Sequence, residues 1–161
     1  MVKKCHKDLI IFTDGACTKN GKQDAKAGYG VYFPNNEFQN ISEKFTQTPI
    51  TNQRAELYAI YTALNKSVVE LNRYNQIIIY SDSLYSIKSL TEWIKNWEKN
   101  GWKTANNKPV QNLDIIRPIY SIIKDNKNRI QFRHVKSHTG GNSFEELGND
   151  HADKLAVKAI Q

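Results

Sequence analysis

Two short apolar segments, each followed directly by an aspartate, constrain the fold of this chain most strongly. Residues 9–13 (Leu-Ile-Ile-Phe-Thr) precede Asp14, and residues 76–81 (Gln-Ile-Ile-Ile-Tyr-Ser) precede Asp82. Neither segment alternates apolar with polar residues, so both are predicted to be strands buried on both faces. A long helical pattern at residues 52–73 lies between them, which allows a crossover that sets the second strand parallel to the first.

The rest of the pattern predicts a mixed sheet with helices on its faces. Residues 27–33 and 41–45 are predicted strands with short connections, which favours an antiparallel meander from the first strand. The other predicted elements are helices at 84–90, 92–99, 112–124 and 149–160, a strand at 129–135 and a polar loop at 137–148. We expect one α/β domain over residues 1–161, with strands 1–3 antiparallel and strands 1, 4 and 5 parallel.

Length and composition exclude several classes of protein. The 161 residues fit one compact domain. No apolar run approaches the roughly 18 residues of a membrane span, and no apolar segment of signal-peptide length follows the basic N-terminus. Cys5 and Cys17 make a poor disulfide framework. We expect a monomer without a membrane partner in a reducing, intracellular compartment, the cytoplasm or the nucleus.

The chain is basic. Lysine and arginine outnumber aspartate and glutamate by 23 to 16, which gives a formal net charge of +7. Such an excess favours a polyanion as partner. An A/T-rich genome would also enrich a chain in lysine, asparagine and isoleucine, so the net charge by itself leaves both interpretations open.

The two aspartates that end the apolar strands are predicted to lie side by side. In an open α/β sheet, ligands bind at the carboxyl ends of the strands where the strand order reverses. Asp14 and Asp82 would repel each other there unless a cation neutralised them, and carboxylate oxygens select Mg²⁺ or Mn²⁺. Either residue alone could instead serve a turn, and Asp82 could cap the helix that follows it.

Two further acids are predicted to point inward from helices. Glu56 falls in line with Ile60 on the core-facing stripe of the long helix, where a carboxylate costs several kcal/mol unless it is paired or coordinated. Asp153 is similarly aligned with Ala156 and Val157 on the last helix. Four inward acids on two strand ends and two helices indicate a two-metal site.

The segments that contain these acids, together with a histidine-bearing segment, resemble the motifs of a known family. They are similar to the successive motifs of type 1 ribonucleases H, in that family's order and over nearly the whole chain: Thr-Asp-Gly-Ala-Cys at 13–17, Thr-Asn-Gln-Arg-Ala-Glu at 51–56, Tyr-Ser-Asp-Ser at 80–83, His-Val-Lys-Ser-His at 134–138 and Gly-Asn-Asp-His-Ala-Asp-Lys-Leu-Ala at 148–156. The resemblance implies the ribonuclease H fold, a five-stranded mixed sheet flanked by helices. It also implies a metal-dependent endonuclease that hydrolyses the RNA strand of RNA/DNA hybrids, largely without sequence preference, and leaves 5′-phosphate and 3′-hydroxyl ends.

The resemblance assigns the metal ligands and the catalytic carboxylates to the same four acids. Asp14 would span two Mg²⁺ ions, Glu56 and Asp82 would hold the water-activating ion, and Asp153 would complete the other, with Mn²⁺ as an alternative metal. Asp150 is a rival for the last position, but the Asp-x-Leu-Ala spacing favours Asp153. Glu56 is further expected to touch a ribose 2′-hydroxyl, the group that distinguishes RNA from DNA.

His138 matches the family's loop histidine and is the fifth expected catalytic residue. Histidine changes its charge near neutral pH, which on a mobile loop suits either proton transfer or help with product release. The two roles stay open. The loop from 138 to 148 is expected to be several residues longer than in many relatives, so the placement of His138 is the least constrained part of the site.

A segment rich in tryptophan and lysine resembles the basic handle of cellular ribonucleases H. This handle (residues 91–108) holds all three tryptophans of the chain, interleaved with lysines. Burial of the indoles in an amphipathic helix is one interpretation, and we prefer it for Trp102. Aromatic and basic side chains together suit a nucleic-acid backbone. The resemblance further implies that Trp93 and Trp97 line the DNA channel.

The resemblance also predicts residues that contact the RNA/DNA hybrid. Thr51 and Asn112 match a pocket that grips a DNA phosphate. One departure concerns Pro49, which stands where many relatives carry a basic residue in that pocket. Contacts at the minor groove are expected from Asn20, Asn52 and Gln53.

Two other functions remain as alternatives. A catalytically silent hybrid-binding module on the same fold would be marked by loss of a site acid, and all four acids are present. A DNA-acting member of the wider superfamily, such as an integrase or resolvase, is disfavoured by the Thr-Asn-Gln-Arg-Ala-Glu motif and by the handle.

Overall fold

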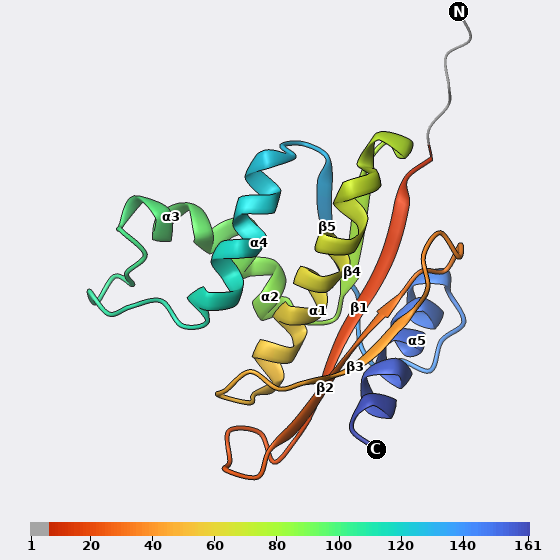
Figure 1. The fold of residues 1–161 in the computed structure, drawn as a ribbon, viewed down its shortest axis with the longest axis horizontal. Helices are drawn as coiled ribbons and strands as arrows, with labels where there is room; N and C mark the ends of the chain where they lie inside the picture. The colour runs from red at the N-terminus through yellow and green to blue at the C-terminus, as the bar shows by residue number, and fades with distance from the viewer. Residues whose placement is uncertain (1–6) are drawn as a thin grey trace, which may run out of the picture.

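The computed structural model of the protein describes residues 7–161, so Cys5 lies outside the described residues. Five strands form one mixed sheet in the order β3-β2-β1-β4-β5 (Figure 1). β1 pairs antiparallel with β2 and parallel with β4, β2 pairs antiparallel with β3, and β4 pairs parallel with β5. The expected mixed sheet is confirmed. The strands are β1 (Leu9–Thr18), β2 (Lys26–Tyr32), β3 (Ile41–Phe45), β4 (Ile77–Ser81) and β5 (Ile130–His134).

Helices cover both faces of the sheet. α1 and α4 pack together on one face, and α5 contacts β1, β2 and β3 on the other (Figure 1). Between α2 and α4, α3 and the loop after it extend away from the sheet. The helices are α1 (Asn52–Ser67) with a 3₁₀ continuation η1 (Val68–Arg73), α2 (Leu84–Lys88), the π-helical segment η2 (Ser89–Trp93), α3 (Ile94–Lys99), α4 (Leu113–Asp125) and α5 (Phe144–Ala159).

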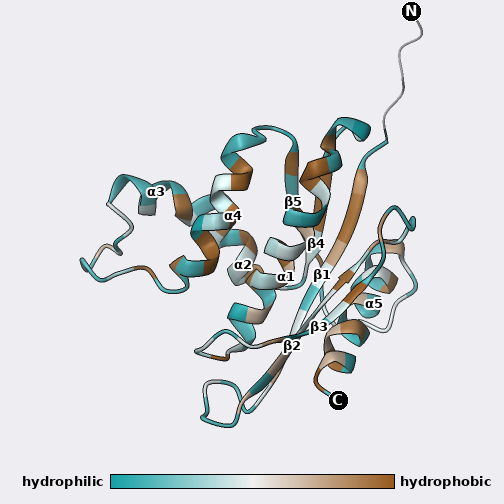
Figure 2. Cartoon of the chain, viewed as in Figure 1, coloured by the Kyte–Doolittle hydropathy of each residue, from teal (hydrophilic) through white to brown (hydrophobic). Residues whose placement is uncertain are grey.

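The two central strands are buried on both faces, as their unbroken apolar sequences predict. All five residues of β4 are buried. Along β1, Ile11 belongs to the large core under α1, whereas Phe12 belongs to a smaller core with Ala152 of α5. Successive side chains of a strand point to opposite faces, so the two cores lie on opposite sides of the sheet. Figure 2 shows the hydrophobic residues that run along β1.

The predicted start of the last helix is wrong. α5 begins at Phe144, so residues 144–148 belong to the helix and the loop is shorter than expected. The cause is a capping box: the Ser143 hydroxyl accepts from the backbone N–H of Glu146, and the Glu146 carboxylate accepts from the backbone N–H of Ser143. This reciprocal pair satisfies two helix-terminal donors in a segment whose two apolar residues, Phe144 and Leu147, are both nearly half exposed.

The predicted break between two helices near residue 91 is also wrong. The π-helical segment η2 joins α2 to α3, and the backbone N–H of Ile94 bonds to the carbonyl of Ser89, five residues earlier. One extra residue in a turn changes which face the following residues present, so a helical pattern that shifts phase mimics a break. The predicted helix at 52–73 likewise tightens into η1 after Ser67.

None of the helices within residues 7–161 is long and apolar enough to cross a membrane.

Candidate metal centre and nucleic-acid surface

Three of the four predicted acids meet at the carboxyl edge of the sheet. One carboxylate oxygen each from Asp14, Glu56 and Asp82 lies within 4.8 Å of the other two. Thr13 and Ser81 are paired across β1 and β4, so the aspartates that follow them emerge side by side. Glu56 comes from the first turns of α1, which packs against β1.

Gly15 lets α1 come this close to β1. A Cβ atom at Gly15 would lie 2.6 Å from the backbone nitrogen of Glu56 and 2.9 Å from the backbone carbon of Ala55. Such distances are shorter than real Cβ contacts, so only glycine fits beneath this turn of the helix. The backbone N–H of Gly15 also donates to Asp14 Oδ1 at 2.9 Å. The glycine of the first motif therefore sets the distance between two of the three acids.

The acids are buried and repel one another. Asp14 is 3% exposed and Glu56 is 4% exposed, and Glu56 Oε2 has no hydrogen-bond partner. Burial first, and then the charges of Glu56 and Asp82, raise the pKa of Asp14 far above its usual range. Burial, followed by the charge of Asp82, also raises the pKa of Glu56. Three ionised carboxylates can share this space only with a cation, and the orphaned Glu56 oxygen fits a hard divalent ion.

Asn149 is a site residue for which the sequence predicted no role. Its side chain is 4% exposed, and its hydrogen bond to Asp82 opposes the rise in the pKa of Asp82 that burial causes. Asn149 Oδ1 has no partner. A signal was present in the sequence, because Asn149 stands four residues before Asp153 and so shares one face of the last helix with it.

Asp153 lies beside the three clustered acids rather than among them. It is half-buried, and its charge contributes to the raised pKa values of Asp14 and Glu56. The predicted inward stripe is partly wrong: Ala152 is fully buried, whereas Val157 is 38% exposed. α5 therefore turns small residues toward the sheet and leaves Asp153 at the border of its buried face.

Its rival Asp150 is exposed and pairs with a lysine. Asp150 Oδ2 pairs with Lys154 Nζ at 3.0 Å, one turn along α5. Asp150 and Asp153 both line a cleft beside the acid cluster. The Asp150 side chain, however, is 53% exposed and already forms an ion pair with Lys154 at the surface. Asp153 is thus the better placed of the two to face the cluster.

His138 lies in the loop that borders this cleft. The cleft, about 230 Å³ in volume, is lined by both His138 and Asp153. His138 is exposed and has a positive φ of 53°. The Glu146 carboxylate tethers the same loop by accepting from Thr139 Oγ1, and this hydrogen bond, the largest cause, lowers the pKa of Glu146. The loop histidine and the last acid therefore face one cavity.

The handle protrudes from the body, with its lysines and Trp93 exposed and its other two tryptophans half-buried. Trp93 is 38% exposed, and its ring centroid lies 6.0 Å from that of Trp97 and 6.1 Å from that of Tyr85. Trp97 is half-buried against the core. Trp102 is also half-buried, beneath the guanidinium of Arg117 at 4.9 Å, which agrees with the structural role preferred for it. The lysines at 95, 99, 103 and 108 are exposed.

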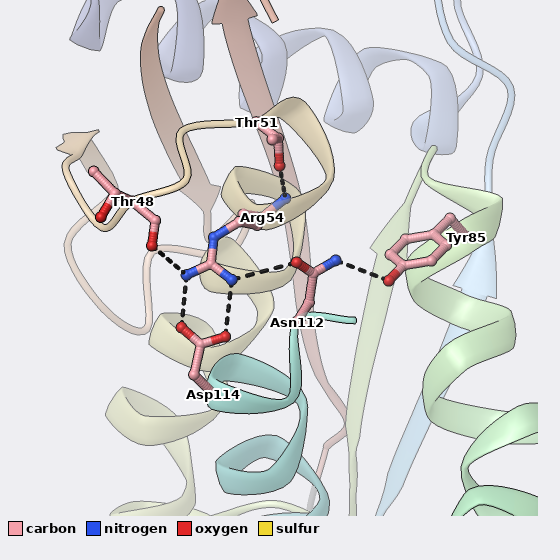
Figure 3. A network of polar contacts seen from close by, with 6 residues as sticks. All are labelled: Thr48, Thr51, Arg54, Tyr85, Asn112 and Asp114. Carbon is pink, nitrogen blue, oxygen red and sulfur yellow. Dashed lines mark hydrogen bonds and ion pairs between the residues drawn. The ribbon is translucent and has the colours of Figure 1, made fainter. Parts of the chain in front are cut away.

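The other predicted contact residues gather at the start of α1. Asn20 Oδ1 accepts from the backbone N–H of Asn52 at 2.9 Å. Thr51 caps α1 through its side chain. Gln53 is exposed beside them, and the Asn112 side chain reaches the same region through Arg54 (Figure 3). Together these positions form a polar surface next to Glu56.

Comparisons with known proteins agree with this arrangement. The RNase H family model matches residues 6–161. Ribonuclease H of Schizosaccharomyces pombe is 40% identical over 152 residues, which cover 94% of this chain and 53% of that protein. Ribonuclease H of Albidiferax ferrireducens is 34% identical over 152 residues, which cover 94% of this chain and 93% of that protein.

A solved structure gives the same result for the fold. The solution structure of the PFV RNase H domain superposes with a TM-score of 0.73 at 26% identity and covers 97% of this chain and 96% of its own. The chain spans about half the length of the first curated relatives it matches, from fission yeast and human. Because the family model covers nearly the whole chain, the chain belongs to the RNase H family.

Proposed function

We propose that this chain hydrolyses the RNA strand of RNA/DNA hybrids with the help of divalent metal ions. The observation that carries the proposal is the convergence of Asp14, Glu56 and Asp82 within 4.8 Å at a buried site. Such a cluster is unfavourable without a cation, and two-metal sites are typical of phosphodiester hydrolysis. The relatives named ribonuclease H support the same reaction.

The four acids would hold two Mg²⁺ ions, with Mn²⁺ as an alternative. The three clustered carboxylates would hold one ion, and Asp14 with Asp153 would hold the other. When bound, such ions supply Lewis-acid stabilisation of the phosphodiester and make water more acidic. The protein's own part is to hold these carboxylates close together and largely shielded from solvent, where bound cations would favour their ionised form. Asn149 would favour the ionised form of Asp82 by donating a hydrogen bond to it.

His138 would act from the loop side of the cleft. Its imidazole can carry a proton to or from the reacting phosphate, or help the product leave. The two roles differ in the step that they affect: the first changes the pH dependence of single-turnover cleavage, and the second changes only multiple-turnover rates.

The hybrid would lie across the start of α1 and the handle. Asn20, Asn52 and Gln53 would contact the minor groove, and the 2′-hydroxyl would meet Glu56. Trp93 and Trp97 with the exposed lysines would follow the DNA strand. Contacts to phosphate and sugar carry no base identity, so cleavage is expected to be largely independent of sequence.

A panel of end-labelled substrates tests the proposal. The same RNA is presented as a hybrid with DNA, as a single strand and as double-stranded RNA, alongside double-stranded DNA, with Mg²⁺ or EDTA. We expect rapid Mg²⁺-dependent cleavage of RNA in the hybrid alone. Hybrid binding without cleavage would favour the silent module, and cleavage of the DNA duplex would favour a DNA-acting enzyme.

The acid cluster makes the stability of the metal-free protein depend on pH. Burial and then the charge of Asp82 raise the pKa of Glu56 to about 8, from an unfolded value near 4. A carboxyl group with a raised folded-state pKa stabilises the fold below its unfolded pKa, and this contribution is lost as pH rises through the folded value. The free energy of unfolding of the parent, relative to that of Glu56→Gln, should therefore fall between about pH 4 and pH 8.

Urea denaturation in EDTA measures this difference at each pH. The two proteins share every other titrating group, so the substitution isolates the cluster. Added Mg²⁺ should restore the stability of the parent at pH 8 and affect the variant less. A difference that stays constant or grows with pH would show that the acids are ionised without strain.

The handle is expected to contribute to binding rather than to chemistry. Trp93→Ala with Lys95→Ala and Lys99→Ala should raise KM about tenfold or more and change kcat little, because stacking and phosphate contacts are made before the reaction. The slope of log KM against log salt should also become shallower. Lys158→Ala, an exposed charge on the last turn of α5, is the matched control. Unchanged KM in the triple variant would remove the handle from the binding surface.

A further inference from the structure

A buried arginine lies behind the proposed phosphate pocket. Arg54 is 3% exposed, and its guanidinium donates to both carboxylate oxygens of Asp114, at 2.8 and 2.6 Å. It also donates to the Thr48 carbonyl at 3.4 Å and to Asn112 Oδ1 at 3.3 Å (Figure 3). One side chain thus joins the loop before α1, the first turn of α1 and the start of α4.

These contacts fix the orientation of the Asn112 amide. A guanidinium has only donors, so the side-chain oxygen of Asn112 must face Arg54 and its nitrogen must face away. Asn112 Nδ2 donates to the Tyr85 hydroxyl at 2.9 Å. The amide nitrogen carries two hydrogens, so one N–H remains for a ligand. Asn112 stands at the cap position of α4 but its side chain makes no capping bond, which leaves the amide for this use.

Thr51 is oriented in the same way. Its hydroxyl oxygen accepts from the backbone N–H of Arg54 at 3.2 Å, and a hydroxyl that accepts one hydrogen bond keeps its own hydrogen to donate. Arg54 therefore occupies an acceptor atom of both Thr51 and Asn112, once through its backbone and once through its guanidinium. Both residues are left with a free donor, the pairing that suits a phosphate oxygen.

Stability alone explains the buried charge poorly. A buried ion pair rarely gains more than its desolvation costs, and its best-attested use is to specify one arrangement of neighbouring groups. Arg54 Nε has no partner, and Asp114 is 56% exposed, so the pair is also not optimised for burial. An apolar side chain at position 54 would fill the same space with a smaller desolvation cost to the free energy of folding.

We propose that Arg54 and Asp114 are positioning residues that hold Asn112 with its free N–H toward a phosphate of the DNA strand, next to Thr51. The proposal rests on the proposed function, because it assigns a role in hybrid binding. Asp114 holds the guanidinium, the guanidinium holds the amide oxygen, and the amide nitrogen meets the phosphate. Neither Arg54 nor Asp114 would touch the substrate.

A double-mutant cycle on KM tests this chain of contacts. Asp114→Asn leaves Arg54 in place and keeps an oxygen that can accept from its guanidinium. Because the substitution removes the charge that pairs with a buried cation, KM is measured at a temperature where thermal unfolding shows that the variant is folded. We expect Asp114→Asn to raise KM about threefold to tenfold with kcat within about twofold, the size of one hydrogen bond. In the Asn112→Ala background the same substitution should have no further effect on KM. Glu70→Gln, which breaks the exposed ion pair with Arg73 in η1, beyond the far end of α1, is the matched control.

A hybrid with one neutral methylphosphonate at successive DNA positions gives a second measurement. At one position the parent should lose affinity, and Asp114→Asn and Asn112→Ala should lose clearly less. Equal KM increases for Asp114→Asn in both backgrounds, an unchanged KM, or a fall in kcat alone would overturn the inference. A parent that leaves hybrid RNA intact would instead refute the proposed function, so the two failures are distinguishable.

Discussion

Asp14→Asn should slow cleavage of hybrid RNA at least about a thousandfold and at the same time stabilise the metal-free protein. Asp14 is expected to contact both ions, and loss of about 4 kcal/mol of transition-state stabilisation corresponds to that factor. The same carboxylate is buried and repelled by Glu56 and Asp82. Its replacement by a neutral amide should raise the free energy of unfolding in EDTA by about 1–3 kcal/mol.

Initial rates with Mg²⁺ and urea denaturation in EDTA measure the two effects on one variant. Asp150→Asn is the matched control, because Asp150 is exposed and paired with Lys154. It should change stability by less than about 0.5 kcal/mol and leave the rate within a few-fold. Nearly full activity in Asp14→Asn would exclude the acid cluster as the catalytic centre. A loss of stability would show that the carboxylate is satisfied without a metal.

Gly15→Ala should damage both the fold and the site. The added methyl group would lie 2.6 Å from the backbone nitrogen of Glu56. A backbone atom in a packed helix cannot avoid this clash by a side-chain rotation. Overpacking of this kind costs about 1–3 kcal/mol or more. The helix can relieve it only by moving away from β1, which carries Glu56 out of the cluster. A displacement of about 1 Å at a reacting centre costs about a hundredfold in rate.

Thermal unfolding and kcat/KM at a temperature where the variant is folded separate these two effects. Gly21→Ala is the control: Gly21 has a positive φ of 78° and open space around its Cβ position, so it carries backbone strain without the clash. We expect Gly21→Ala to lose about 1 kcal/mol and to keep its activity. A Gly15→Ala protein with the stability and rate of the parent would contradict the close packing of α1 on β1.

The sequence predicted the elements whose apolar pattern is set by packing against the core. Apolar runs that end in Asp14 and Asp82 placed β1 and β4 side by side, and the phase of Glu56 on its helix predicted its burial. These features follow from strong local rules, since an unbroken apolar strand fits only the middle of a covered sheet. The order of the strands, with β1 between β2 and β4, follows from the meander and the crossover.

Features set by polar side chains were harder to predict. The start of α5 depends on the capping box of Ser143 and Glu146. These residues lie in a mostly polar stretch whose composition is also typical of a loop. The joint between α2 and α3 depends on one π-helical turn around Ser89. For Asp153, small residues on α5 tolerate close packing on the sheet and so rotate the helix away from the stripe that its larger apolar residues predict.

Polar contacts between residues that are far apart in the sequence left no local sequence pattern from which they could be predicted. Arg54 meets Asp114 sixty residues later, and a charged residue in a helix is usually predicted to face solvent. Asn149 meets Asp82 across the sheet edge. Only the three-dimensional arrangement shows that the charge at Arg54 is buried and that the amide of Asn112 is oriented by it.

The charges that matter for binding lie in two regions of the structure. The exposed lysines of the handle place positive charge at the surface, where it would attract a nucleic-acid backbone. The acid cluster opposes it at the carboxyl edge of the sheet, where the phosphates of a bound hybrid would otherwise be repelled. Bound divalent ions would reconcile the two, since they would neutralise the acids and attract the phosphates.

One measurement tests the central claim most directly. A hybrid labelled on both strands is incubated with the protein and Mg²⁺, and the products are resolved with analysis of their ends. We expect cuts in the RNA strand alone, with 5′-phosphate and 3′-hydroxyl ends, because the proposed reaction uses water rather than the 2′-hydroxyl to attack the phosphodiester. An intact RNA strand, a cut DNA strand, or 2′,3′-cyclic phosphate ends that persist in EDTA would contradict it.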